Sequence, residues 1–147
     1  MKYDKYTVQA SGSFLKYEFH SDGPRGLIAK QVLYKEFDEY AGVYNLGFGD
    51  LDASGKINDI VVTDNSDSEK VLATVALTVI KFFELYPDKS VFITGSTESR
   101  TRLYRMGISK NLEELQNDFY LFGLLGKDWH PFKKGHDYKA FMVQKKK

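Results

Sequence analysis

Residues 66–87 read SDSEKVLATVALTVIKFFELYP, and the spacing of the apolar positions in this stretch decides the fold class. These positions recur at steps of three and four, which places them on one stripe of a helix. Ser66 and Glu69 have the spacing of an N-terminal capping box, and Pro87 ends the helix. The stretch therefore predicts a long amphipathic helix over about residues 67–86. The apolar stripe consists of Leu72, Val75, Val79, Phe82, Phe83 and Tyr86.

The chain before this helix has the period of two that is typical of β-strands. Apolar and polar residues alternate over residues 15–19, and residues 27–37, 44–48 and 57–62 also have strand character. Residues 52–55 read DASG, a hairpin turn. Because these strands follow one another over short connections, they favour an antiparallel meander.

The chain after the long helix contains both periods. In chain order it predicts a strand at 90–94, a shorter helix at about 97–107 that ends at Gly107, a helical turn at 112–119, and strands at 120–125 and 138–143. The sequence therefore predicts one α+β domain over residues 1–147, with a mostly antiparallel sheet of about six or seven strands packed against the two helices. We expect the helix stripe to meet Tyr44, Leu46 and Phe48 in the core.

Composition excludes several classes of protein. With 42% hydrophobic and 28% charged residues in 147, the chain has enough apolar surface to fold, unlike a disordered chain. The absence of cysteine excludes disulfide frameworks and thiolate metal sites. The chain starts without an apolar run typical of a secretory signal, and residues 71–86 are too short and amphipathic to span a bilayer. We therefore expect a cytoplasmic protein that does not bind membranes.

Charge is balanced overall but uneven along the chain. Residues 1–96 contain ten Lys or Arg against fourteen Asp or Glu, whereas residues 97–147 contain eleven against six. The net charge of +1 argues against a nucleic-acid-binding protein, which usually has an excess of positive charge. The basic last third favours a small anionic ligand or a protein as the partner.

The most suggestive local feature is a strand that passes through a small turn into a helix, in the sequence SVFITGSTESRTRLY over residues 90–104. The first turn of a helix exposes backbone N–H groups that attract anions, and arginine binds phosphate or carboxylate with two parallel hydrogen bonds. We therefore predict an anion-binding pocket. Its residues are Gly95, Ser96, Thr97, Arg100 and Arg102. The alternative interpretation is that Ser96 or Thr97 only caps the helix and the arginines form surface ion pairs.

Two groups of possible metal ligands lack a known ligand spacing. His130 and His136 match no helical face or known signature, so we expect no metal site there. Turn-forming and capping roles explain most of the carboxylates that gather around the hairpin and the start of the next helix, which are Asp50, Asp52, Asp59, Asp64 and Asp67.

The stretches YNLGFGD at 44–50, KVLATV at 70–75 and GSTESRTRLY at 95–104 resemble those of an uncharacterised family of small bacterial proteins. The resemblance extends over most of the chain. This resemblance implies no known activity.

A hairpin, a strand, a long helix, another strand and a helix containing Leu103 and Tyr104 are similar to the C-terminal half of the GNAT fold of N-acetyltransferases. This resemblance implies acetyl-coenzyme A as the cofactor and Tyr104 as the acid that protonates its departing thiolate. An acidic strand residue such as Glu36 would serve as the base. Residues 64–69, where the family binds the pyrophosphate, contain three carboxylates and no glycine, so our first expectation includes no cofactor.

Three functions from different classes follow. The leading hypothesis is a non-enzymatic binding module whose pocket lies at the turn over residues 95–97. The first alternative is an acyltransferase that uses acetyl-coenzyme A and Tyr104. The second is a protein-interaction module or homodimer, because eleven Phe and ten Tyr exceed what the core needs and some should be exposed at an interface or in a cleft.

Overall fold

The computed structural model describes residues 4–58 and 65–147 and contains one sheet with three helices. The helices are α1 (Ser68–Leu85), α2 (Glu98–Lys110) and α3 (Leu112–Asp118). The strands are β1 (Gln9–Ala10), β2 (Lys16–Gly23), β3 (Gly26–Glu36), β4 (Val43–Leu51), β5 (Ile57–Asn58), β6 (Ser90–Ile93), β7 (Phe119–Leu125), β8 (Asp128–Pro131) and β9 (Phe141–Lys145).

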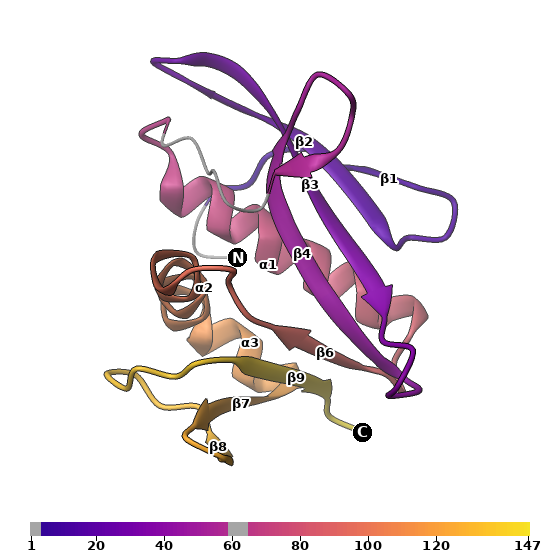
Figure 1. The fold of residues 1–147 in the computed structure, drawn as a ribbon, viewed down its shortest axis with the longest axis vertical. Coiled ribbons are helices and arrows are strands. Elements are labelled where there is room, and N and C mark those ends of the chain that lie inside the picture. Colours follow the sequence, from indigo (N-terminus) through magenta and orange to yellow (C-terminus); the bar gives the residue numbers. More distant parts are fainter. Residues whose placement is uncertain (1–3, 59–64) are drawn as a thin grey trace.

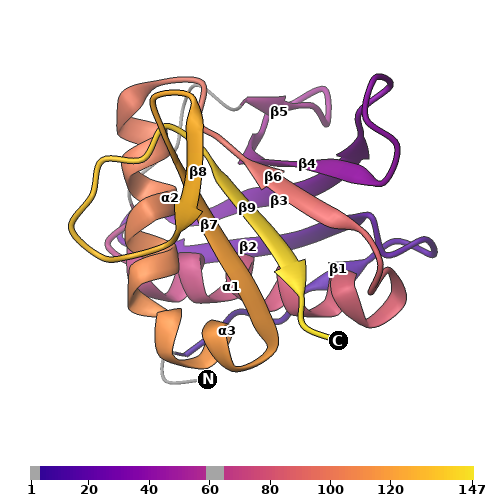
Figure 2. The same ribbon diagram turned by 90° about the horizontal axis from the view of Figure 1, so that it is seen from below.

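The sheet has the order β1-β2-β3-β4-β6-β9-β7-β8, and β5 pairs with β4 (Figure 1). Strands β4 and β6 are parallel, as expected for strands that a helix connects, and the other described pairs are antiparallel. Helices α1 and α3 lie on the same side of the sheet (Figure 2). The predicted α+β class, with a mostly antiparallel sheet packed against helices, is confirmed.

The strand predictions are confirmed in outline and corrected in detail. Strands β2 to β5 form the predicted meander, although residues 59–62 of the last predicted strand lie outside the described residues. The short strands β1 and β8 were not predicted. The predicted strand at 138–143 begins only at Phe141, because Lys139 and Ala140 both bond to the backbone of Leu124, and this two-to-one pairing interrupts the regular ladder.

Helix α1 has the predicted position, but the predicted capping box is wrong. The N-cap is Asp67, not Ser66, and its side chain makes no capping hydrogen bond. Its carboxylate instead accepts hydrogen bonds from the hydroxyls of Tyr6 and Ser21, which tie the start of the helix to the N-terminal segment and β2. The helix stops before Pro87, as predicted.

Helix α2 starts where the sequence predicts and continues beyond the predicted end at Gly107 to Lys110. Gly107 lies at the contact with α1, where an added Cβ would be 3.1 Å from the Leu72 side chain. The glycine therefore allows two helices to approach and does not end α2.

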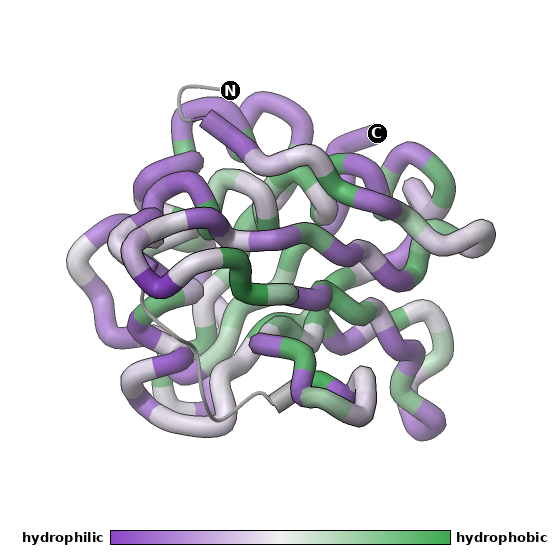
Figure 3. The backbone as a smooth tube through the Cα atoms, turned by 90° about the horizontal axis from the view of Figure 1, so that it is seen from above, coloured by the Kyte–Doolittle hydropathy of each residue, from purple (hydrophilic) through white to green (hydrophobic). Residues whose placement is uncertain are grey.

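The core forms where the apolar stripe of α1 meets the strands, as predicted. Leu46 and Phe48 of β4 are fully buried, and the ring of Phe82 packs 4.6 Å from that of Tyr34 and 5.2 Å from that of Tyr44. Hydrophobic and hydrophilic residues alternate along the strands (Figure 3). Aromatic packing of this kind contributes beyond the area that it buries.

Tyr17 carries a buried hydroxyl that has no hydrogen-bond partner in the described part of the chain. Burial, followed by repulsion from Glu84, raises the pKa of Tyr17 to about 12. We expect Tyr17→Phe to increase the free energy of unfolding at pH 7 by about 1 kcal/mol, because it removes an unsatisfied polar group.

The same variant should resist alkali better than the wild type. Above pH 10 the hydroxyl of Tyr17 ionises in the unfolded chain but stays neutral in the folded protein up to about pH 12. Rising pH therefore favours the unfolded state, and phenylalanine removes this effect. Urea unfolding at pH 7, 10 and 11.5 measures both effects, with the exposed Tyr40→Phe as a control. A loss of stability at pH 7 would contradict the assignment.

Candidate functional site

The turn between β6 and α2 is closely packed by its own helix. An added Cβ at Gly95 would lie 2.4 Å from the backbone nitrogen of Thr101 and 2.5 Å from Cβ of Arg100. The Gly95 N–H donates to Oγ1 of Thr101 over 3.1 Å. Glycine is therefore required here because the turn approaches the first turn of α2, and its N–H already has a partner in the protein.

Thr97 caps α2. Its Oγ1 accepts a hydrogen bond from the backbone N–H of Arg100 at 3.2 Å, and its carbonyl accepts one from the N–H of Thr101 at 3.0 Å. Two N–H groups of the first turn are thus satisfied by the chain itself. The structure shows the capping role that the sequence offered as the alternative interpretation for Thr97.

Arg100 points into the protein, with 5% of its surface exposed. Its Nη2 donates to the carbonyl oxygen of Phe48 on β4 and lies 3.3 Å from the hydroxyl of Tyr104. The guanidinium lies 5.7 Å from the ring centroid of Phe48 and 5.8 Å from that of Tyr104. Within the described residues, Nε and Nη1 have no hydrogen-bond partner. The interior of the protein thus contains an arginine that links α2 to β4.

Arg102 lies on a different side of α2 from Arg100, since residues two apart on a helix do not face each other. Arg102 lines a cleft of about 550 Å³ beside the β6–α2 turn, whereas Arg100 does not. We call this the α2 cleft. It is lined by turn residues 94–97, by Glu98, Thr101, Arg102 and Arg105 of α2, and by residues 137–139. The structure thus brings together four of the five predicted site residues and separates Arg100 from them.

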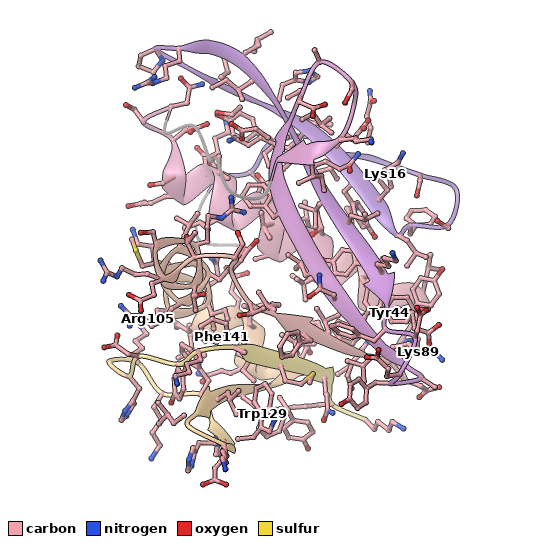
Figure 4. All side chains as sticks on the ribbon, viewed as in Figure 1. Lys16, Tyr44, Lys89, Arg105, Trp129 and Phe141 are labelled. Carbon is pink, nitrogen blue, oxygen red and sulfur yellow. The ribbon has the colours of Figure 1, made fainter. Side chains whose placement is uncertain are left out.

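The side chains that line the α2 cleft include three cations and two carboxylates. Arg105 forms an ion pair with Asp137, and its Nη1 also lies 3.4 Å from the carbonyl oxygen of His136. Figure 4 shows Arg105 on the outer side of α2, beside the segment that leads to β9. Beside this ion pair, the lining contains two more cations, Arg102 and Lys139, and one more carboxylate, Glu98. The net charge of the lining is therefore positive.

Lys139 and Asp137 are residues of the cleft that the sequence did not reveal. They reach it because β9 pairs with β6, and the Thr94 hydroxyl donates to the carbonyl of Lys139 over 2.9 Å. This contact joins residues 45 positions apart, so no local pattern could have found it.

The sequence also did not predict a buried ion pair between β3 and β4. Nζ of Lys30 lies 2.6 Å from Oδ1 of Asp50, and the Lys30 side chain is 1% exposed. The ammonium lies 5.9 Å from the ring centroid of Phe48. One feature of the sequence could have revealed this ion pair: Lys30 occupies an inward position of β3, two and four residues before the buried Val32 and Tyr34.

The two residues of the acyltransferase hypothesis, Tyr104 and Glu36, have different environments. Tyr104 is buried, and it lines an apolar cavity of about 40 Å³ between the helices and the sheet. Glu36 is exposed at the end of β3, where its carboxylate accepts a hydrogen bond from the backbone N–H of Gly42 over 2.7 Å. Nothing in this geometry brings Glu36 to Tyr104, and acyl transfer stays a prediction from the sequence.

Within residues 4–58 and 65–147, no three His, Asp or Glu side chains lie close enough together to hold a metal ion. None of the helices described there is both long and apolar enough to cross a membrane.

The fold and the cleft define a small α+β domain with a cationic cleft at the start of a helix. By its sequence the chain belongs to a family of unknown function, DUF6934, whose profile matches residues 2–146. The resemblance to an uncharacterised family is thereby confirmed. No curated protein and no solved structure matches the chain, so the resemblance to the GNAT fold gains no support.

Proposed function

We propose that this protein binds a small anionic ligand, with a phosphate or carboxylate group, in the α2 cleft. One observation carries the proposal: cations from two distant segments, Arg102 on α2 and Lys139 before β9, line one cleft beside the glycine-containing turn. Guanidinium and ammonium groups bind such anions through charge-assisted hydrogen bonds.

The roles of the five predicted residues differ. Gly95, Ser96 and Thr97 form the wall of the cleft, and Arg102 contacts the ligand. Arg100 is a positioning residue, because its guanidinium bonds to Phe48 and fixes the first turn of α2 against the sheet.

Titration of ¹⁵N-labelled protein with inorganic phosphate, and separately with acetate, tests the proposal. The backbone signals of residues 94–97 and 137–139 should shift and saturate. We expect Arg102→Ala to weaken phosphate binding at least tenfold, because a hydrogen bond to a charged group contributes about 1.5–3 kcal/mol.

Arg25→Ala is the matched control, since Arg25 is an exposed arginine on the β2–β3 turn and does not line the cleft. It should leave the phosphate affinity unchanged. Equal losses in both variants would show nonspecific charge attraction and overturn the proposal. So would signals of the cleft that do not move at tens of millimolar phosphate.

A further inference from the structure

The face of the sheet opposite α1 and α3 carries a patch of large apolar side chains. Along β6, Val91 and Ile93 are buried while Phe92 between them is only half-buried, so Phe92 points to this open face. Met142 pairs with Phe92 and with Phe122, which extends the apolar surface across β6, β9 and β7. We call this surface the open-face patch. It consists of Phe37, Tyr40, Phe92, Phe122, Trp129 and Met142.

Four rings of the open-face patch form a continuous row. The ring centroid of Phe37 lies 6.3 Å from that of Tyr40 and 5.8 Å from that of Phe92. Phe92 in turn lies 6.2 Å from Trp129 of β8. Because β9 and β7 separate β6 from β8 in the sheet, this last contact requires the sheet edge to curl toward the open face. Figure 4 shows Trp129 at the β8 edge of the sheet.

Both ends of the row are exposed: Tyr40 is 64% exposed and Trp129 is 41% exposed. Aromatic residues are enriched at protein interfaces, and a contiguous exposed apolar patch on a soluble domain marks an interaction site. The row therefore has the composition of an interface core.

The two ends of the row have opposite charge. The exposed carboxylates Asp38 and Glu39 precede Tyr40 and outnumber Lys35, which alternation places on the same face as Phe37. The Trp129 end is flanked by the exposed Lys127 and Lys133, with one aspartate, Asp128, between them in the chain. A surface with one acidic end and one basic end is complementary to itself after a twofold rotation, which places each end against the other end of the partner.

We propose that the open-face patch binds a second copy of this chain in a twofold-symmetric dimer. The row of rings from Tyr40 to Trp129 packs against the same row of the partner, in the opposite direction. The carboxylates beside Tyr40 then face the lysines beside Trp129 of the other copy. This inference is independent of the anion site, because the α2 cleft and the open-face patch share no residue.

Sedimentation equilibrium of the full chain measures the association, and Trp129, the protein's one tryptophan, gives a second signal. We expect a dimer that dissociates on dilution, with a red shift of Trp129 emission as its ring enters water. Trp129→Ala should raise the dissociation constant about thirtyfold or more, as for an interface hot spot. A circular dichroism spectrum like that of the wild type shows that this variant folds.

Charge reversal gives a test that does not depend on the apolar core. Glu39→Lys and Lys127→Glu should each weaken the dimer, and the double variant should restore it, because the two charges then face each other with exchanged signs. Lys16→Glu, far from Trp129 in Figure 4, should have no effect. A monomer at all concentrations up to about 1 mM overturns the proposal, as does a dimer that neither Trp129→Ala nor the charge reversals weaken. A monomer that binds single-stranded nucleic acid through this face overturns it too.

Discussion

Phe82→Ala should lower the free energy of unfolding by about 3–5 kcal/mol, the range for removal of a buried phenylalanine ring. Phe82 is fully buried and its ring contacts those of Tyr34, Tyr44, Phe83 and Tyr86 at centroid distances of 4.6, 5.2, 5.2 and 5.0 Å. These neighbours come from β3, β4, α1 and its C-cap, so the surrounding structure cannot close around the missing ring without moving several elements.

For a domain of this size the loss corresponds to a fall of the melting temperature of about 10 °C. Urea unfolding followed by circular dichroism and by Trp129 fluorescence measures the change, and both signals should show one transition. Leu85→Ala is the control on the same helix, because Leu85 is 52% exposed and its loss should change stability by less than about 0.5 kcal/mol. Similar effects of the two substitutions would contradict the assignment of Phe82 to the centre of the core.

The position of α1 could be predicted because its signals are local. The stripe that contains Phe82 repeats with the helical period, and Pro87 cannot continue a helix. The cap of α1 could not be predicted, because the carboxylate of Asp67 is taken by Tyr6 and Ser21, 61 and 46 positions away. Local preference for a capping box was overridden by these tertiary hydrogen bonds.

Only those features of the candidate site that depend on neighbouring residues in the sequence could be predicted. The glycine, the cap at Thr97 and the nearby arginines follow from a strand that runs into a helix. Which arginine faces the sheet depends on how α2 packs against β4, and the sequence of α2 alone does not contain that information. Lys139 enters the cleft because β9 inserts between β6 and β7, a feature of the whole topology.

The open-face patch was predicted as a surplus of aromatic residues and not as a surface. Phe92 alternates with buried residues in a strand, so its direction was available from the period of two. The direction of Trp129 could not be predicted, because β8 was not predicted. The contact of Trp129 with Phe92 arises from the curl of the sheet edge.

Gly95→Ala should lower the free energy of unfolding by an amount near the upper end of the range of about 1–3 kcal/mol for an overpacked position. The three atoms nearest to the new Cβ are the nitrogen of Thr101 at 2.4 Å and the Cβ and carbonyl carbon of Arg100 at 2.5 and 2.7 Å. All of them are fixed to the backbone of the first turn of α2, so none can rotate away. The turn and the helix must separate, which lengthens the hydrogen bond from the Gly95 N–H to Thr101.

This separation also moves the base of the Arg100 side chain, whose guanidinium is held by Phe48 on β4. Amide shifts over residues 97–102 should therefore change in the variant, and its phosphate affinity should fall with its stability. Gly12→Ala is the control, because no heavy atom lies within 4 Å of the added Cβ there. An unchanged free energy of unfolding would contradict the packing of the turn. A destabilised variant that keeps full phosphate affinity would show that the cations of the α2 cleft bind the anion without help from the turn.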